Sequence, residues 1–292
     1  MEEQLSDADV TLLMSSIRTG TPLAPARRQD FVVNTRALLG HAKSYGETCA
    51  RLAALCLDDM AAVAAHTGPE WDAGVAEEIQ WWWTWINTLR RQGKLDSWAG
   101  LRDRPFPFES DVAALAGAAP LRCLNIGCGP RPDLGEKSAV RIEFVHMDPL
   151  ARAYNKLMTF LDAPGGGDVV FGAVEILDRL DVGRFNFIAA KNCLDHAFDV
   201  PEGLNQMAAA LDERGVISLG HFENEAEAQG YLGFHKWNIE IQGDRIRAWS
   251  KERSELFDHA THGLALGWDR RMVRKGNGQL HPFLDIRLTR GL

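Results

Sequence analysis

Cysteine is scarce in this chain of 292 residues: five are present, and no two of them form a C-x-x-C pair. Without paired spacing, the sequence shows neither a disulfide framework nor a zinc ribbon. We therefore expect a reducing, cytoplasmic setting in which the thiols serve mainly as small core residues. The five are Cys49, Cys56, Cys123, Cys128 and Cys193.

Long apolar runs are also missing, since none approaches the roughly 20 residues that a membrane helix needs. The first residues, Met1 to Leu5, lack the cationic start and apolar stretch of a secretory signal. Positive charge is low as well: the formal net charge is -8, and no basic stripe or tail is present. This balance argues against nucleic acid or an anionic membrane as the main partner, so we predict neither.

Helical periodicity fills the first hundred or so residues. Apolar residues recur at helical spacing between about residues 28 and 66, and again from Trp71 to about Arg91. The proline-containing loop Arg102 to Phe108 then leads toward a different pattern. An all-helical segment ahead of an α/β pattern suggests a separate cap. We predict a helical N-terminal cap and substrate region, residues 1–118, followed by a cofactor-binding domain, residues 119–292.

Four tryptophans lie within Trp81-Trp-Trp-Thr-Trp85, inside the last of these predicted helices. On a helix, Trp81 and Trp85 share a face while Trp82 and Trp83 point elsewhere. Two interpretations are open: packing in the core and at the interface between cap and sheet, or an aromatic wall over the active site that can hold a sugar face or a cation. We favour core packing because most aromatic stripes are buried.

Short apolar runs alternate with helical patterns after residue 120, which is typical of a parallel, doubly wound sheet. Helices are expected at about residues 149–161 and 202–211, and Asp133 is a candidate cap for a helix after the first strand. The predicted strands are Leu121–Ile126, Arg141–Met147, Asp168–Phe171, Arg184–Ala190 and Val216–Leu219.

The last sixty residues instead predict two hairpins. His235–Ile241 pairs with Arg245–Trp249 across a Gln-Gly-Asp turn, and Leu264–Val273 pairs with Pro282–Leu288 across a glycine turn. We expect the final hairpin to close one edge of the sheet in antiparallel fashion.

A glycine turn, Gly127-Cys-Gly-Pro130, follows the first strand directly. Glycine there lets the backbone approach a ligand where a Cβ would collide, at the edge where open α/β sheets bind ligands. A dinucleotide site would need a third glycine, and Pro132 stands in its place. Asp148 ends the second strand, where it could accept hydrogen bonds from a ribose; the alternative is a helix cap beside Pro149.

Several motifs together resemble the class I S-adenosylmethionine-dependent methyltransferases, over about Arg122 to Leu219. Besides Asp148, they are Leu124-Asn-Ile-Gly-Cys-Gly-Pro130, Gly172-Ala-Val-Glu175, Asn192-Cys-Leu-Asp-His196 and Asp212-Glu-Arg-Gly-Val216. The resemblance implies an α/β, doubly wound, Rossmann-like sheet of seven strands whose last hairpin is antiparallel. It also implies S-adenosyl-L-methionine as the cofactor.

Positions within these motifs imply the cofactor contacts. The glycine turn would face the methionine and ribose, Asp148 would hold the ribose, the Ala173–Glu175 loop would border the adenine, and Asn192 and Cys193 would lie near the methyl group. Asn125 stands where the family usually carries an acid. The expected cofactor-binding residues are Asn125, Gly127, Cys128, Gly129, Asp148, Pro149, Val174, Glu175, Asn192 and Cys193.

Three histidines are candidates for the catalytic base that takes a proton from the acceptor. His196 and His221 follow the fourth and fifth strands, and His235 lies in the insertion after the fifth. For each, a structural histidine bonded to backbone is the alternative. Asp195 and Glu223 could orient an imidazole. Asp195, Glu223 and Glu225 could converge as oxygen ligands, but no spacing marks them as a set, so we predict no metal.

The sequence thus predicts an enzyme that moves a methyl group from S-adenosyl-L-methionine to an oxygen or nitrogen of a small molecule. Gly230–Asn238 looks similar to methyltransferases found with bacterial polysaccharide or secondary-metabolite pathways, so a sugar or secondary metabolite is one candidate acceptor. The alternatives are an NAD-dependent oxidoreductase and a non-catalytic cofactor-binding protein of the same fold. The oligomeric state is open, with a homodimer as one option.

Overall fold

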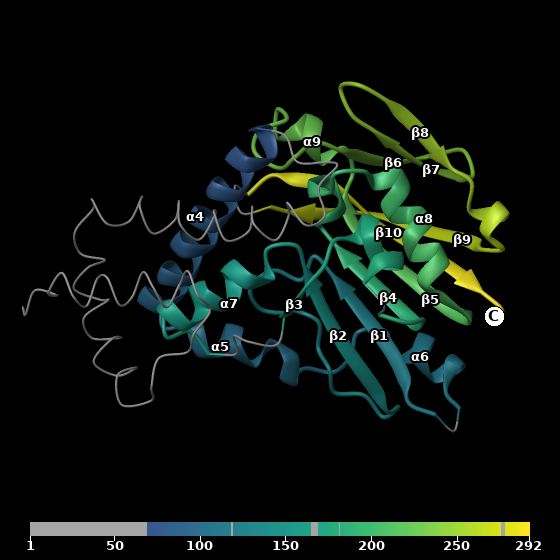
Figure 1. The fold of residues 1–292 in the computed structure, drawn as a ribbon, viewed down its shortest axis with the longest axis horizontal. Helices are drawn as coiled ribbons and strands as arrows, with labels where there is room; N and C mark the ends of the chain where they lie inside the picture. Colours follow the sequence, from purple (N-terminus) through teal and green to yellow (C-terminus); the bar gives the residue numbers. More distant parts are fainter. Residues whose placement is uncertain (1–68, 118, 165–168, 181, 276–277) are drawn as a thin grey trace, which may run out of the picture. The chain divides into compact units, whose positions relative to one another are not determined.

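The computed structural model describes residues 69–117, 119–164, 169–180, 182–275 and 278–292 (Figure 1). The helices predicted before residue 69 lie outside this part of the chain. The described residues form two compact units: one holds residues 69–99 and 150–164, and the other holds the rest. The domain boundary expected between residues 118 and 119 stays a prediction.

The first unit is built from three helices, which are α4 (Pro69–Arg91), α5 (Leu95–Ala99) and α7 (Ala151–Phe160). Glu78 joins α4 to α7, because its Oε1 accepts hydrogen bonds from Trp82 Nε1 at 2.7 Å and from Tyr154 Oη at 3.2 Å. No helix among the described residues is long and apolar enough to cross a bilayer.

The tryptophans of α4 divide between core and surface. Trp83 is buried and packs against Phe160, as core packing predicts. Trp81 and Trp85 do share a face, and their rings stack with centroids 5.7 Å apart. Core packing is nevertheless wrong for these two, because 53% and 41% of their surfaces are exposed.

The second unit contains a seven-stranded sheet with the order β3-β2-β1-β4-β5-β10-β9 (Figure 1). The first five strands are parallel, whereas β10 is antiparallel to both β5 and β9. The predicted doubly wound sheet with an antiparallel last hairpin is therefore confirmed. The bounds are β1 Leu121–Ile126, β2 Ile142–Asp148, β3 Val169–Phe171, β4 Phe185–Lys191, β5 Leu211–Phe222, β9 Ala265–Arg274 and β10 Leu280–Arg290.

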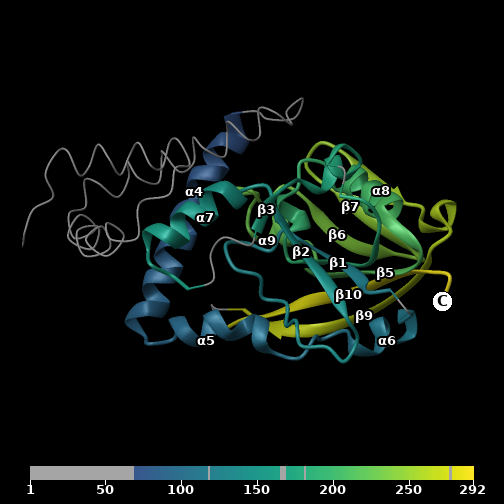
Figure 2. The same ribbon diagram turned by 60° about the horizontal axis from the view of Figure 1, so that its bottom comes forward.

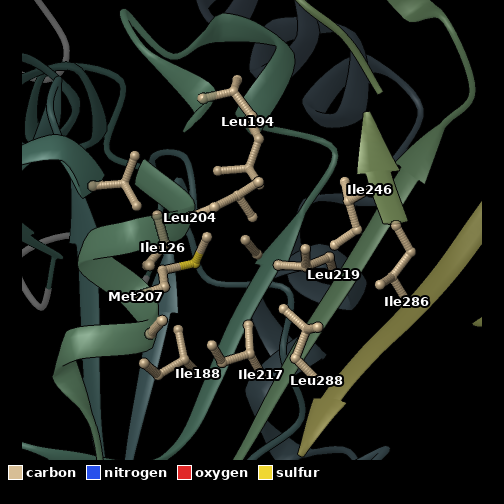
Figure 3. Packing of buried hydrophobic residues seen from close by; sticks show 14 of the residues in the cluster. Ile126, Ile188, Leu194, Leu204, Met207, Ile217, Leu219, Ile246, Ile286 and Leu288 are labelled. Atoms are coloured by element: carbon tan, nitrogen blue, oxygen red, sulfur yellow. The ribbon is translucent and has the colours of Figure 1, made fainter. Parts of the chain in front are cut away.

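Apolar side chains alternate between the two faces of this sheet, so each face has a core of its own. On one face α8 (Val200–Ala210) lays Leu204 and Met207 over Ile188 and Ile217 (Figure 3). The other face packs around Phe106 and α6 (Glu109–Leu115). Figure 2 shows α6 and α8 on opposite sides of the sheet.

A second, three-stranded sheet packs on the α8 face, where Ile246 lies against the β5 and β10 side chains (Figure 3). Its strands are β6 (Asn238–Gln242), β7 (Arg245–Trp249) and β8 (Ser254–Phe257). The antiparallel β6–β7 hairpin confirms the first predicted hairpin. The third strand was not expected from the sequence. The short helices of this unit are α9 Glu225–Ala228, η1 Gly100–Asp103, η2 Val174–Arg179, η3 Leu194–His196 and η4 His259–His262.

The helix expected after the first strand does not form, because residues 127–141 contain no helix. The carboxylate of Asp133, the predicted cap, instead lies 2.9 Å from Lys191 Nζ. Two prolines in the segment lack the N–H groups that a helix needs. Gly135 is held against the chain before β1, where an added Cβ would lie 2.4 Å from the carbonyl oxygen of Pro105.

Candidate active site

The glycine turn adopts the conformation that its sequence predicts. Gly127 and Gly129 both have positive φ, at 60° and 68°, a region that other residues enter only with strain. An added Cβ at Gly127 would lie 2.4 Å from Cβ of Cys193. The register of the parallel strands sets Ile126 beside Met147 and Ala190, so the turn, the end of β2 and the end of β4 share one edge of the sheet.

Asp148 lies directly against this turn. The side chain is 5% exposed, and its Oδ2 accepts the Gly129 N–H at 2.9 Å. Asp148 is not the N-cap residue of the following helix, because that position is Leu150. The structure therefore sets a carboxylate beside a glycine turn at the ligand-binding edge. That Asp148 and Pro149 contact a ribose stays a prediction.

Asn125 belongs to a partly buried chain of polar contacts that sequence reasoning missed. Its Nδ2 lies 3.4 Å from His146 Nδ1, and His146 Nε2 lies 3.0 Å from Glu136 Oε1. Arg102 donates to the same carboxylate. Burial alone would raise the pKa of Glu136, but His146 and Arg102 outweigh it and hold that pKa below the ordinary value.

An amide at position 125 fits this chain of contacts. Where His146 accepts from Asn125 at Nδ1, its proton lies on Nε2, from which it donates to Glu136. No local signal links residues 34 positions apart, so the Arg102–Glu136 contact could not be read from the sequence.

The loop after β3 is fixed by backbone contacts. Glu175 is 7% exposed, and its Oε1 accepts the N–H groups of Phe198 at 2.7 Å and Asp199 at 3.2 Å. Burial raises the pKa of this carboxyl group. Val174 packs so closely that an added Cβ at Gly203 would lie 2.8 Å from it. The carboxylate thus holds the chain before α8, and the adenine contact expected of this loop stays a prediction.

Asn192 and Cys193 continue the edge of the sheet after β4. Asn192 has a φ of 50° and donates its N–H to the Gly220 carbonyl oxygen at 2.7 Å. Asparagine tolerates this left-handed conformation better than most residues. Cys193 donates its S–H to the Ile126 carbonyl oxygen at 3.3 Å. Burial raises the pKa of the Cys193 and Cys128 thiols, so both are neutral packing groups rather than nucleophiles.

Two of the three predicted catalytic histidines meet at one carboxylate. His235 Nδ1 lies 2.6 Å and His196 Nε2 lies 3.4 Å from Oδ2 of Asp195. The distant loop is held in place because Lys236 and Trp237 donate their N–H groups to the Asp195 carbonyl oxygen, at 3.0 and 3.1 Å. We call Asp195, His196 and His235 the histidine–aspartate cluster.

The electrostatics of the cluster favour an ionised carboxylate. Burial acts to raise the pKa of Asp195, which is 2% exposed. The neighbouring charge of His196 and the hydrogen bond from His235 outweigh burial and hold the pKa at about 2. Both imidazoles remain about a quarter exposed, at 27% and 26%, so a ligand can reach them.

His221, the third candidate, is placed differently. It is 1% exposed in the core, and no described group accepts from or donates to its Nε2. Burial lowers its pKa to about 4, which makes it neutral near pH 7. His221 follows Gly220, whose carbonyl oxygen accepts the Asn192 N–H at 2.7 Å, so it lies beside the segment that carries Asp195. Its catalytic role stays a prediction.

The acids of the β5 insertion do not converge on Asp195. Glu223 pairs with Arg270, and the buried Glu225 pairs with Lys275. The role proposed for Glu223 in orienting an imidazole therefore has no support in these contacts. Asp195, Glu223 and Glu225, the acids considered from the sequence as oxygen ligands, therefore do not come together.

No family model matches this sequence, and no curated protein matches it either. Solved structures do match. A plantazolicin methyltransferase is 10% identical, with 84% of this chain and 98% of that chain covered and a TM-score of 0.43. An S-adenosylmethionine-dependent methyltransferase from Thermotoga maritima is 14% identical over 71% and 97% of the two chains, with a TM-score of 0.37.

A third match is the magnesium protoporphyrin IX methyltransferase from Synechocystis PCC 6803, solved with bound S-adenosylhomocysteine. It is 14% identical, covers 74% of this chain and 87% of its own, and has a TM-score of 0.35. The function proposed next rests on the strand order and the site geometry of this chain.

Proposed function

We propose that this protein transfers a methyl group from S-adenosyl-L-methionine to an oxygen or nitrogen of a small molecule. The observation that carries the proposal is the pairing of Asp148 with the Gly127–Gly129 turn at the carboxyl edge of the sheet. The two glycines lack a Cβ, so the backbone of the turn can come close to the donor, and a carboxylate fixed beside it can accept from ribose hydroxyls.

The acceptor side is supplied by the histidine–aspartate cluster. It begins two residues after Cys193, which touches the glycine turn. An S-adenosyl sulfonium is already an activated donor, so the protein must align the acceptor and receive its proton. An imidazole oriented by an ionised Asp195 can take that proton near neutral pH. His235, with the shorter contact to Asp195, is the proposed base.

The NAD-dependent alternative fits the observed geometry less well. Dinucleotide sites direct the pyrophosphate at the N-terminus of the helix that follows the glycine turn. Residues 127–141 form no helix in this protein. The backbone dipoles that such a site needs are therefore not provided there.

Calorimetry with S-adenosylhomocysteine and with NAD tests the donor. We expect heat with S-adenosylhomocysteine only, and at least tenfold weaker binding in Asp148→Ala. Asp133→Ala is the matched control, because this carboxylate is 46% exposed and pairs with Lys191 rather than with the backbone of the turn. Binding of NAD alone, or an Asp148→Ala variant that binds as tightly as Asp133→Ala, would overturn the proposal.

Turnover separates the enzyme from the alternative of a non-catalytic cofactor-binding protein. The purified protein is incubated with S-adenosylmethionine and a metabolite library that includes sugars and secondary metabolites. We expect at least one fraction to yield S-adenosylhomocysteine together with a product heavier by one methylene unit. Binding of the donor with no conversion in any fraction would favour the non-catalytic protein.

A further inference from the structure

Three ligand-type atoms converge in the histidine–aspartate cluster. Oδ2 of Asp195 lies 2.6 Å from His235 Nδ1 and 3.4 Å from His196 Nε2, and the two nitrogens are 3.2 Å apart. They come from adjacent residues after β4 and from a loop forty positions away. The chain therefore folds back to bring them together.

Hydrogen bonds alone account poorly for the close approach of these three ligand-type atoms. If both imidazoles donate to Asp195, their N–H groups face each other across 3.2 Å. If only His235 donates, its N–H is shared between Asp195 Oδ2 and His196 Nε2. A single proton then serves three ligand-type atoms. A cation at their centre would be attracted to all three.

We propose that Asp195, His196 and His235 form a binding site for one divalent transition-metal ion. Ligands held about 2.1 Å from such an ion lie roughly 3 Å from one another. The 3.2 and 3.4 Å spacings are close to this value, whereas the 2.6 Å contact between Asp195 and His235 would lengthen on binding. Two imidazoles and one carboxylate suit zinc, cobalt, iron or manganese, whereas magnesium and calcium prefer oxygen ligands only.

Two buried polar atoms without hydrogen-bond partners among the described residues support the same site. Oδ1 of Asp195 is buried and has no hydrogen-bond partner among the described residues. A buried carboxylate oxygen left unpaired is costly, and coordination through both oxygens would remove that cost. His221 Nε2 is buried and unpartnered in the same way.

Contacts outside the cluster hold it in place, and its imidazoles are accessible to a ligand. The hydrogen bonds from Lys236 and Trp237 to the Asp195 carbonyl oxygen fix the position of the loop that carries His235. The partial exposure of His196 and His235 leaves room for further ligands, as in catalytic sites with three protein ligands. This inference rests on the proposed methyl transfer and revises one part of it: with a metal bound, the imidazoles would act as its ligands, and the metal rather than His235 would prepare the acceptor.

Metal titration of the full chain tests the site without any methyl donor. Chelator-stripped protein is titrated with Zn²⁺ by calorimetry and with Co²⁺ by visible absorption. We expect one equivalent per chain, and a Co²⁺ spectrum without sulfur-to-metal charge transfer. His196→Ala and His235→Ala should each weaken binding more than tenfold.

His262→Ala is the matched control, because His262 lies outside the cluster and contacts Asn205. It should bind Zn²⁺ as the unaltered protein does. Zn²⁺ should also raise the melting temperature of the unaltered protein and of His262→Ala, but of neither cluster variant.

Two results would overturn the site: no binding of Zn²⁺ or Co²⁺, or binding that both cluster variants retain. If an alanine variant has a lowered melting temperature in the absence of metal, His196→Gln is used instead. Glutamine keeps roughly the side-chain volume of histidine and removes the imidazole ligand. Loss of metal binding leaves the donor calorimetry unaffected, so failure of this site and failure of the proposed function are distinguishable.

Discussion

Gly127 and Cys193 are packed so closely that no side chain fits between them. A Cβ on the glycine would lie 2.4 Å from Cβ and 2.6 Å from Sγ of Cys193. The same glycine has a φ of 60°. The two constraints are independent, because one arises from the local backbone and the other from a strand end 66 residues away.

Gly127→Ala should therefore destabilise the protein by more than conformational strain alone. A left-handed alanine costs about 1–2 kcal/mol, and overpacking typically adds about 1–3 kcal/mol. Gly243→Ala is the control, since Gly243 has a φ of 64° and nothing lies within 4 Å of its added Cβ. Urea unfolding should show the larger loss for Gly127→Ala; equal losses would mean that Cys193 moves aside freely.

Substitutions of Glu175 separate the effect of its charge on stability from the effect of its hydrogen bonds. Glu175→Gln retains an oxygen for the Phe198 and Asp199 N–H groups, and burial already disfavours the ionised form. We expect it to cost under about 1 kcal/mol, whereas Glu175→Ala leaves two N–H groups unpaired at about 1–3 kcal/mol each. The free energy of unfolding in urea measures both. If Gln and Ala cost the same, the hydrogen bonds do not hold the start of α8.

The strand pattern could be predicted because each signal is local. The apolar run Leu121–Ile126 ends at a glycine, and β1 has those bounds. Both predicted hairpins formed for the same reason, since turn residues separate two runs that pair with each other. The helix expected around Asp133 does not form. It was inferred from the alternation of strands and helices in doubly wound sheets, although the prolines of this segment disfavour a helix.

The site depends on contacts that have no local signal. The sequence marked Asp195, His196 and His235 as single candidates, but could not show that a loop forty residues on returns to the carbonyl oxygen of Asp195. It also grouped Asp195 with acids that the fold pairs with basic residues of the last hairpin. Chain reversal over such distances is decided by packing in the core, where the three-stranded sheet meets β5 and β10.

His221 should make stability depend on pH. Its pKa is about 4 in the folded state because of burial, against 6.5 in the unfolded chain. The unfolded state therefore binds the proton first, so the stability present above pH 6.5 is lost as the pH falls toward 4. Between pH 7 and pH 5 this loss amounts to about 2 kcal/mol. The lowered pKa of Asp195 acts only below its ordinary value of 3.8, outside this window.

Urea unfolding at pH 7 and pH 5 measures the effect of this buried imidazole. His221→Gln removes the titrating group, so its stability should change by about 2 kcal/mol less between the two values than that of the unaltered protein. Comparing the changes, rather than the stabilities, cancels the cost of the substitution itself. His262→Gln, an alteration outside the core, should keep the full dependence. If His221→Gln keeps it too, another group is responsible for the loss of stability in acid.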